Sequence, residues 1–193
     1  RSLLTNSRKQ YSTLAQQEGQ RLNAILTDSA NAILFVAQSQ RVIAYAEQLN
    51  TGATGRSGSL AALNSVMQQE FRNLLYHGRD DRQLRFIDSN GHERVRVDRK
   101  DHHLITVEST ALQDKSSSRY VAETLALPHG EIYFSDITLN REHGKVVEPH
   151  TPHLRIATPV ASPQDKKIMG MLILNVDIGA QLRYVRPALG DIS

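Results

Sequence analysis

Histidines are the residues of this sequence best suited to bind a metal ion, and there are eight of them. His102 and His103 are adjacent, and His143, His150 and His153 follow in a polar stretch. Zinc sites often use two histidines three to five residues apart together with a third ligand, and His150 and His153 have this spacing. Prolines precede both of them, which indicates a loop. We therefore interpret the histidines as solvated and expect no metal or other cofactor, with pH sensing as the alternative role.

Arg155 is the charged residue with the least ordinary sequence context, because it lies inside the largely apolar run 154–160. A buried guanidinium requires a partner. Asp136 and Glu123 are the candidates, so we expect a structural ion pair. Contact with a ligand is the alternative.

Enzyme chemistry finds little support in the sequence. There is no glycine-rich phosphate loop, nucleophile elbow or HExxH motif. The absence of cysteine excludes thiol catalysis, thiolate zinc sites and disulfides. The net charge of +3 comes from 23 basic and 20 acidic residues that are interleaved along the chain, and aromatic residues make up 5%. This dispersal argues against nucleic-acid binding.

The first fifty residues are predicted to form one long helix. Between Arg8 and Leu49 there is no proline and a single glycine, Gly19. A helix of forty residues is about 60 Å long, more than a small sheet can cover. We therefore expect part of it to pair with a second copy; the alternative is a bend at Gly19 or Ser29 that folds the helix back. The expected coiled-coil seam consists of Tyr11, Leu14, Leu22, Ile25, Ala32 and Val36.

A glycine-rich break at 51–58 precedes a second predicted helix, 60–76, with Ser59 as its N-cap and Gly78 at its end. The apolar period then changes from 3.6 to 2. The predicted strands are 83–88, 92–98, 131–137, 154–160 and 167–177, with a short helix at 119–127. This order predicts an α+β fold, with a central five-stranded antiparallel sheet flanked by helices. The expected regions are 1–58 (helix and linker), 59–180 (sheet module) and 181–193 (connector).

Six motifs in this order resemble the Cache, or PAS-like, extracytoplasmic sensor superfamily of bacterial histidine kinases, diguanylate cyclases and chemoreceptors. The resemblance covers residues 8–190 and is strongest to the membrane-distal module of a double-Cache sensor histidine kinase. The motifs are LRFIDSNGHERVRV (84–97), LQDKS (112–116) leading to Arg119 and Tyr120, GEIYFS (130–135), LNREHG (139–144), LRIATPV (154–160) and GMLILNVDI (170–178).

The resemblance implies a ligand site. Arg119 and Tyr120 fall near the position that holds a ligand carboxylate in amino-acid-binding members. Tyr133 and Ser135 fall on a Tyr-x-Asp pair, and Asp177 falls on the terminal Asp that holds the ligand amine. Because Ser135 replaces a carboxylate and the usual Trp is absent, we expect a carboxylate or neutral polar ligand at least as readily as an amino acid. Alternatively, Tyr133 and Asp177 are ordinary sheet residues, with Asp177 as a helix cap.

The resemblance also implies the setting of the domain. We expect a periplasmic module of an inner-membrane receptor, a histidine kinase or, as the alternative, a diguanylate cyclase or chemoreceptor. The expected partners are a small-molecule ligand and a second copy bound through the N-terminal helix. No apolar run reaches the roughly 20 residues of a membrane span. Since the sequence starts with Arg1 and lacks a signal peptide, we expect the membrane anchors to lie outside it. A ligand-free scaffold for dimerisation or partner docking is the alternative of another class.

Overall fold

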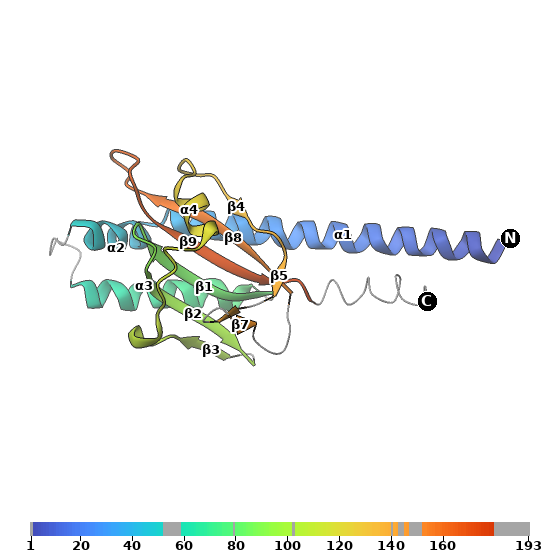
Figure 1. Cartoon of the computed structure of the whole chain (residues 1–193), viewed down its shortest axis with the longest axis horizontal. Coiled ribbons are helices and arrows are strands. Elements are labelled where there is room, and N and C mark those ends of the chain that lie inside the picture. Colours follow the sequence, from blue (N-terminus) through green and yellow to red (C-terminus); the bar gives the residue numbers. More distant parts are fainter. Residues whose placement is uncertain are drawn as a thin grey trace.

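A long helix lies along one layer of the molecule, and an antiparallel sheet forms the next layer (Figure 1). The computed structural model describes residues 2–51, 59–78, 80–101, 103–139, 141–142, 145–146 and 152–179. The predicted connector 181–193, His102, His143, His150 and the side chain of Tyr11 lie outside the described residues. No helix in the described ranges is long and apolar enough to cross a lipid bilayer.

The predicted long helix is in fact two helices, α1 (Ser2–Ala37) and α2 (Gln40–Thr51). The break is at residues 38–39, and α1 is continuous through Gly19 and Ser29, the two positions that the alternative interpretation gave for a bend. Ser39 ends one helix and begins the next: its Oγ accepts a hydrogen bond from Val42 N at 3.3 Å. The N-terminal part of α1 projects beyond the sheet (Figure 1).

Helix α3 (Leu60–His77) matches its prediction closely. Ser59 is the N-cap, because its Oγ accepts from Ala62 N at 3.2 Å, and Gly78 N–H closes the other end on Leu74 O. The apolar residues recur every three to four positions, so they share one face of the helix. That buried face consists of Leu63, Met67, Phe71 and Leu75.

The sheet is antiparallel throughout, with the order β3-β2-β1-β9-β8-β4 and β5 paired to β8. The α+β class and the five predicted strands are confirmed, and two further strands make the sheet seven-stranded. The fourth predicted strand begins earlier, at residue 152, and the third is reduced to two residues. The strands are β1 (Asp81–Asp88), β2 (Glu93–Lys100), β3 (His103–Thr106), β4 (Tyr133–Phe134), β5 (Thr138–Leu139), β8 (Pro152–Ala161) and β9 (Ile168–Asp177).

Strands β3 and β5 are the two that were not predicted. Strand β3 has four residues, none of them fully buried, and both residues of β5 are exposed, so neither strand has a strong apolar pattern of its own. A separate hairpin pairs β6 (Arg141–Glu142) with β7 (Lys145–Val146). The remaining helical elements are a 3-10 turn (Ser109–Ala111) and α4 (Arg119–Leu125).

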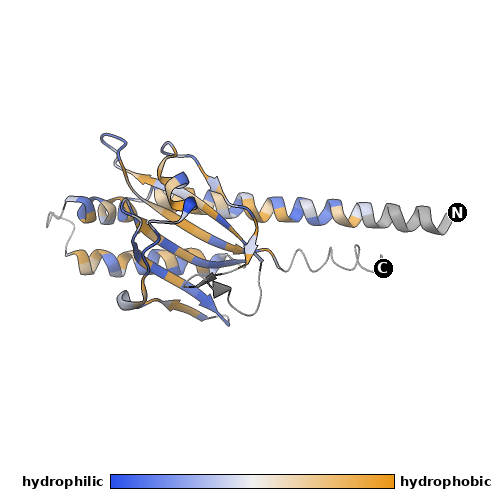
Figure 2. Ribbon diagram, viewed as in Figure 1, coloured by the Kyte–Doolittle hydropathy of each residue, from blue (hydrophilic) through white to orange (hydrophobic). Residues whose placement is uncertain are grey.

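The two faces of the sheet bury different sets of residues, because successive strand residues point to opposite sides. One face packs against α1, α2 and α3 in a large apolar core that includes Ile33, Val42, Phe71, Phe86 and Leu174. The central strands and the helix stretches beside them are accordingly rich in apolar residues (Figure 2). The other face has a smaller apolar cluster beneath α4. The end of α1 and α2 thus share one core with the sheet module.

Candidate functional site

The sheet face that lies away from α1 to α3 carries the chemistry-bearing residues. Residues opposed across the strands share a face. Asn175 on β9 is opposed to Arg155 on β8 and to Gln83 on β1. Two residues further on, Ile173 is opposed to Arg85 on one side and to Ala157 on the other, and Ala157 is opposed to Tyr133.

Three of the sequence-predicted site residues come together on this face. Tyr120 of α4 and Tyr133 of β4 both pack against the small apolar cluster of Val121, Ala157 and Ile173. The guanidinium of Arg155 lies 5.2 Å from the centre of the Tyr120 ring, within the range of a cation–π contact.

Arg155 is held without a carboxylate. The ion pair predicted with Asp136 or Glu123 is not formed in the described part of the chain, and Arg155 Nη1 instead donates to Thr138 Oγ1 at 3.0 Å. Its Nε is buried and has no hydrogen-bond partner among the described residues. Burial lowers the pKa of Arg155, yet a guanidinium stays charged at neutral pH. The site therefore contains a half-buried positive charge with an unused donor.

Arg119 and Glu123 form an outer rim on α4. Arg119 Nε donates to Glu123 Oε1 at 2.6 Å, and the Arg119 side chain is 89% exposed. This hydrogen bond raises the pKa of Arg119 and lowers the pKa of Glu123. Burial, and then hydrogen bonding to Glu123, raise the pKa of Tyr133. The Tyr133 hydroxyl is therefore a protonated donor at neutral pH.

Ser135 and Asp177 are both satisfied by neighbours. Ser135 Oγ accepts from Arg155 N at 3.0 Å and donates to Asp136 O at 2.7 Å. Asp177 pairs with Arg82 at 2.8 Å and accepts from Gly179 N at 2.7 Å.

Asp177 also lies away from Tyr133. Its cross-strand partner His153 is four residues from Ala157, the partner of Tyr133, or about 13 Å along the strand. The strand register therefore does not place Asp177 beside Tyr133. His153 itself is 6% exposed within β8, so its interpretation as a solvated loop residue was wrong.

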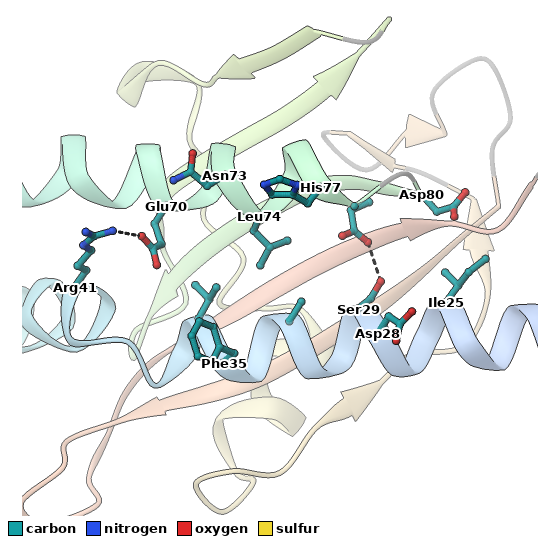
Figure 3. Close-up of a pocket in the computed structure, with 14 residues that line it drawn as sticks. Ile25, Asp28, Ser29, Phe35, Arg41, Glu70, Asn73, Leu74, His77 and Asp80 are labelled. Atoms are coloured by element: carbon teal, nitrogen blue, oxygen red, sulfur yellow. Dashed lines mark hydrogen bonds and ion pairs between the residues drawn. The ribbon is translucent and has the colours of Figure 1, made fainter.

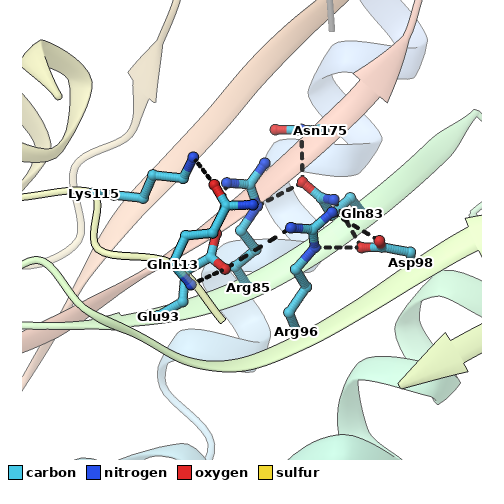
Figure 4. Close-up of polar contacts among 8 residues, drawn as sticks. All are labelled: Gln83, Arg85, Glu93, Arg96, Asp98, Gln113, Lys115 and Asn175. Carbon is cyan, nitrogen blue, oxygen red and sulfur yellow. Dashed lines mark hydrogen bonds and ion pairs between the residues drawn. The ribbon is translucent and has the colours of Figure 1, made fainter. Parts of the chain in front are cut away.

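The sequence did not lead us to predict a buried polar network that lies next to Arg155. Figure 4 shows the polar contacts of this network. Arg85 Nη1 pairs with Glu93 Oε1 at 2.9 Å, and Arg96 makes a two-pronged contact with Asp98 at 2.8 and 2.9 Å. Gln83 joins the two pairs, since it accepts from Arg85 Nε and donates to Asp98 Oδ1 at 2.7 Å. All five residues are less than 8% exposed. Strand alternation places Arg96 and Asp98 on the face of β2 opposite Val95 and Val97, and the structure shows that this face is also covered.

The network continues to the two ends of the site. Gln113 closes it on the side of the loop before α4: its backbone N donates to Glu93 Oε2 at 3.1 Å, and Lys115 Nζ donates to Gln113 Oε1. On the other side Asn175 Nδ2 donates to Gln83 Oε1 at 3.0 Å. Asn175 Oδ1 is buried and has no hydrogen-bond partner among the described residues.

The unused acceptor of Asn175 and the unused donor of Arg155 belong to directly opposed residues of β9 and β8. An unpaired buried polar atom is costly, about 1–3 kcal/mol each. A polar molecule that accepts from Arg155 and donates to Asn175 would satisfy both atoms. Such a molecule would meet the Tyr120 ring on the same face. No group of three or more metal-ligating side chains is present among the described residues.

Comparisons with known proteins follow this geometry. A family model described as the bacterial histidine kinase sensor domain matches residues 64–186. A solved domain of a sensory box/GGDEF family protein from Vibrio parahaemolyticus is 24% identical, with a TM-score of 0.72 over 90% of this chain and 61% of that one. No curated protein sequence is significantly similar.

Two other solved structures are similar in fold. The extracellular domain assigned to a histidine kinase, vpHK1S-Z8, is 25% identical with a TM-score of 0.70, over 90% of this chain and 58% of that one. The sensor domain of the V. cholerae histidine kinase DctB is 12% identical with a TM-score of 0.63, over 96% of this chain and 61% of that one. The chain thus spans about three fifths of the length of these structures.

The family match includes the strands that carry the site. Residues 64–186 contain the whole sheet, helix α4, and both Arg155 and Asn175. The match covers well over half of the 193 residues, and the extracellular kinase domain above shares the same fold. The chain belongs to the sensor domain family of bacterial histidine kinases.

Proposed function

We propose that the chain is the periplasmic ligand-sensing part of an inner-membrane histidine kinase, and that its ligand binds on the sheet face beneath α4. The observation that carries the proposal is the pair of unused buried atoms, Arg155 Nε and Asn175 Oδ1, on opposed residues. A diguanylate cyclase or chemoreceptor parent is the alternative, and the similarity to the GGDEF family protein supports the former.

The proposed ligand is a small organic acid that also carries a hydroxyl or amino group. A carboxylate matches Arg155, a fixed cation with no ion-pair partner in the described part of the chain. A hydroxyl or amine supplies the hydrogen that Asn175 Oδ1 can accept. Tyr120 adds an aromatic wall, and Tyr133 adds a nearby hydroxyl that is hydrogen-bonded to Glu123. Neither Asp177 nor Ser135 offers an unused anionic group to a ligand. A ligand that carries only a positive charge is therefore disfavoured at this site.

Signal transfer would run through β8 and β9. These strands carry Arg155 and Asn175 on one face, while α1 packs on their other face. A ligand that draws the two strands together would shift the helix that packs against them. We further propose that the projecting part of α1 pairs with a second copy, with Leu14 of the predicted seam in the contact. Leu22 and Ile25 of that seam pack against the core of their own domain, and Ala32 lines a cavity between α1 and α3. Val36 of the predicted seam belongs instead to the domain core, where it is 6% exposed.

The test is binding of a library of organic acids and amino acids, measured by thermal shift and then by isothermal titration. Arg155→Met should weaken binding of any hit by about 10- to 100-fold, the value of one charge-assisted hydrogen bond. The matched control is Arg94→Met, which removes an arginine that pairs with Asp88 at the β1–β2 turn. A hit that binds Arg155→Met as tightly as the natural chain refutes this site.

A ligand-free scaffold is the second candidate, and a specific observation favours it. Most polar side chains on the face, including Arg85, Glu93 and Asp98, already satisfy one another. The scaffold predicts no hit from the library together with a dimer in analytical ultracentrifugation. The ligand-sensing proposal predicts at least one saturable hit.

A further inference from the structure

A cavity lies on the opposite side of the sheet from Arg155 and Asn175, between α1 and the C-terminal half of α3 (Figure 3). Its volume is about 610 Å³, within the range of small-molecule sites. Helix α1 supplies Ile25, Ala32 and Phe35 to its walls, and Leu74 faces them from α3. The cavity is separated from Arg155 and Asn175 by the sheet, so it is independent of the proposed sensing site.

The charges along this cavity are unevenly placed. At one end Arg41 Nη1 and Glu70 Oε2 form an ion pair at 2.7 Å, so their charges cancel. At the other end lie the carboxylates Asp28 and Asp80 (Figure 3), and Asp81 also lines the cavity. None of the three forms an ion pair with a described residue. The exposed Phe35 and half-buried Leu74 lie between the two ends. The cavity therefore has an acidic end and an apolar middle.

Asp81 is the carboxylate buried at the acidic end. It is 4% exposed, and its Oδ1 accepts from Ser29 Oγ of α1 at 2.9 Å. Its Oδ2 lies over Gly78, where any side chain would collide with it, since an added Cβ would come within 1.9 Å. The glycine therefore leaves room for this carboxylate to line the cavity.

Other charges approach Asp81 from each packed element. Asp28 lies on α1, His77 on α3 and Asp80 in the preceding turn. Arg99 of β2 donates to the backbone oxygens of Asp81 and Gly78, at 3.1 and 3.0 Å, so its guanidinium is engaged with carbonyls. Desolvation dominates, and it raises the pKa of Asp81 to about 6. A buried carboxylate in this state at the base of a cavity marks a candidate binding group.

We propose that this cavity binds an organic cation with an apolar body, the cationic head at Asp81 and Asp28 and the body between Phe35 and Leu74. Glu70 and His77 are seven residues apart on α3, so the cavity offers about 10 Å along the helix. That length suits an amine with a short alkyl or aryl chain. The bound cation joins α1 to α3 and gives the projecting helix a second chemical input.

The probe is n-hexylamine, with sodium hexanoate as the matched anion of the same length. We expect saturable binding of the amine at pH 8 in isothermal titration and no binding of hexanoate. At pH 5 the affinity should fall about tenfold, because most of the Asp81 carboxyl is protonated below its pKa of about 6. Equal binding of amine and hexanoate, or no saturation by 10 mM amine (roughly the weak limit of a specific site), overturns the proposal.

Two variants locate the site. Asp81→Asn should weaken amine binding at least tenfold, the value of one charge-assisted contact. Ala32→Leu fills the cavity without changing charge and should also weaken binding. Asp136→Asn removes an exposed carboxylate elsewhere and should leave the affinity unchanged. If Asp81→Asn and Ala32→Leu both bind the amine as tightly as the natural chain, this assignment is wrong. Arg155→Met should not alter amine binding, which separates this test from that of the sensing site.

Discussion

Replacing Asp81 by asparagine should stabilise the domain at pH 8 and have a much smaller effect at pH 4. Desolvation raises the pKa of the Asp81 carboxyl from 3.8 to about 6, whereas its hydrogen bond from Ser29 opposes that rise. Because the folded-state pKa lies above the unfolded one, the folded state binds the proton more tightly. The associated stability is present in full below pH 3.8 and is lost as the pH rises through 6.

The magnitude follows from the shift. From 3.8 to about 6 at 1.36 kcal/mol per pH unit, protonation stabilises the fold by about 3 kcal/mol at most. Between pH 4 and pH 8 the linkage relation gives a loss of about 2.4 kcal/mol. Asparagine has no such proton to lose, so the stability of the variant relative to the natural chain should grow by that amount. For a domain of this length, this corresponds to roughly 5 to 10 °C in melting temperature.

The measurement is urea unfolding of both chains at five pH values from 4 to 8. Asp136→Asn is the matched control, because this carboxylate is exposed, and its difference from the natural chain should stay flat. A difference between Asp81→Asn and the natural chain that varies by less than about 0.5 kcal/mol over this range, the scale of an ordinary surface substitution, would refute the reasoning. Asp81 would then not be desolvated as the structure has it.

Two other predictions concern what holds the sheet together, and urea unfolding measures both. Arg85→Met should cost about 3–5 kcal/mol because it removes the 2.9 Å ion-pair partner of the buried Glu93 and leaves among the described residues only the longer contact with Arg96, at 3.9 Å. Adding Glu93→Leu should recover much of that loss, and additive losses in the double variant would contradict the ion pair. Phe71→Ala should cost about 3–5 kcal/mol since the ring is fully buried, while Val66→Ala on the same helix, at 37% exposure, should cost less than about 1 kcal/mol. Equal costs at the two positions would mean that α3 packs through another face.

Elements with strong local signals could be predicted from the sequence. Helix α3 has a capping serine, an apolar stripe at helical spacing and a terminal glycine. The β1–β2 hairpin has the Asn90–Gly91 step, and Gly91 adopts the positive φ of 89° that such a turn requires. In both cases all the information lies within about twenty residues. Packing elsewhere in the chain did not have to be known.

The break between α1 and α2 could not be predicted in the same way. Gln38 and Ser39 are neither glycine nor proline, and the residues on both sides are ordinary helix formers. Val36 and Ala37 are buried before the break, and Val42 and Tyr45 after it. The chain turns there so that both helices can bury residues in one core. That constraint comes from the sheet, more than a hundred residues away for β8 and β9.

The buried network was missed for a related reason. Alternation in β2 places Arg96 and Asp98 opposite Val95 and Val97, but it does not show whether that face is covered. Gln83, the partner of Asp98, lies on β1, and the loop that closes the network contributes Gln113, so burial depends on pairing between distant segments. Arg155 was recognised as unusual only because apolar neighbours surround it. Arg85, between Leu84 and Phe86, has a similar sequence context, and this context was the available signal of a buried guanidinium in β1.

Successive side chains of a strand point to opposite faces of the sheet, and this alternation explains how the fold can couple a bound ligand to a helix. On β8, Arg155 faces α4, while its neighbours Leu154 and Ile156 face the core shared with α1; on β9, Asn175 lies between Leu174 and Val176 in the same way. A rigid strand cannot move one face without moving the other. A ligand that binds Arg155 and Asn175, as proposed, would therefore act on α1 through a single layer of backbone, with no need for a chain of intermediate side chains.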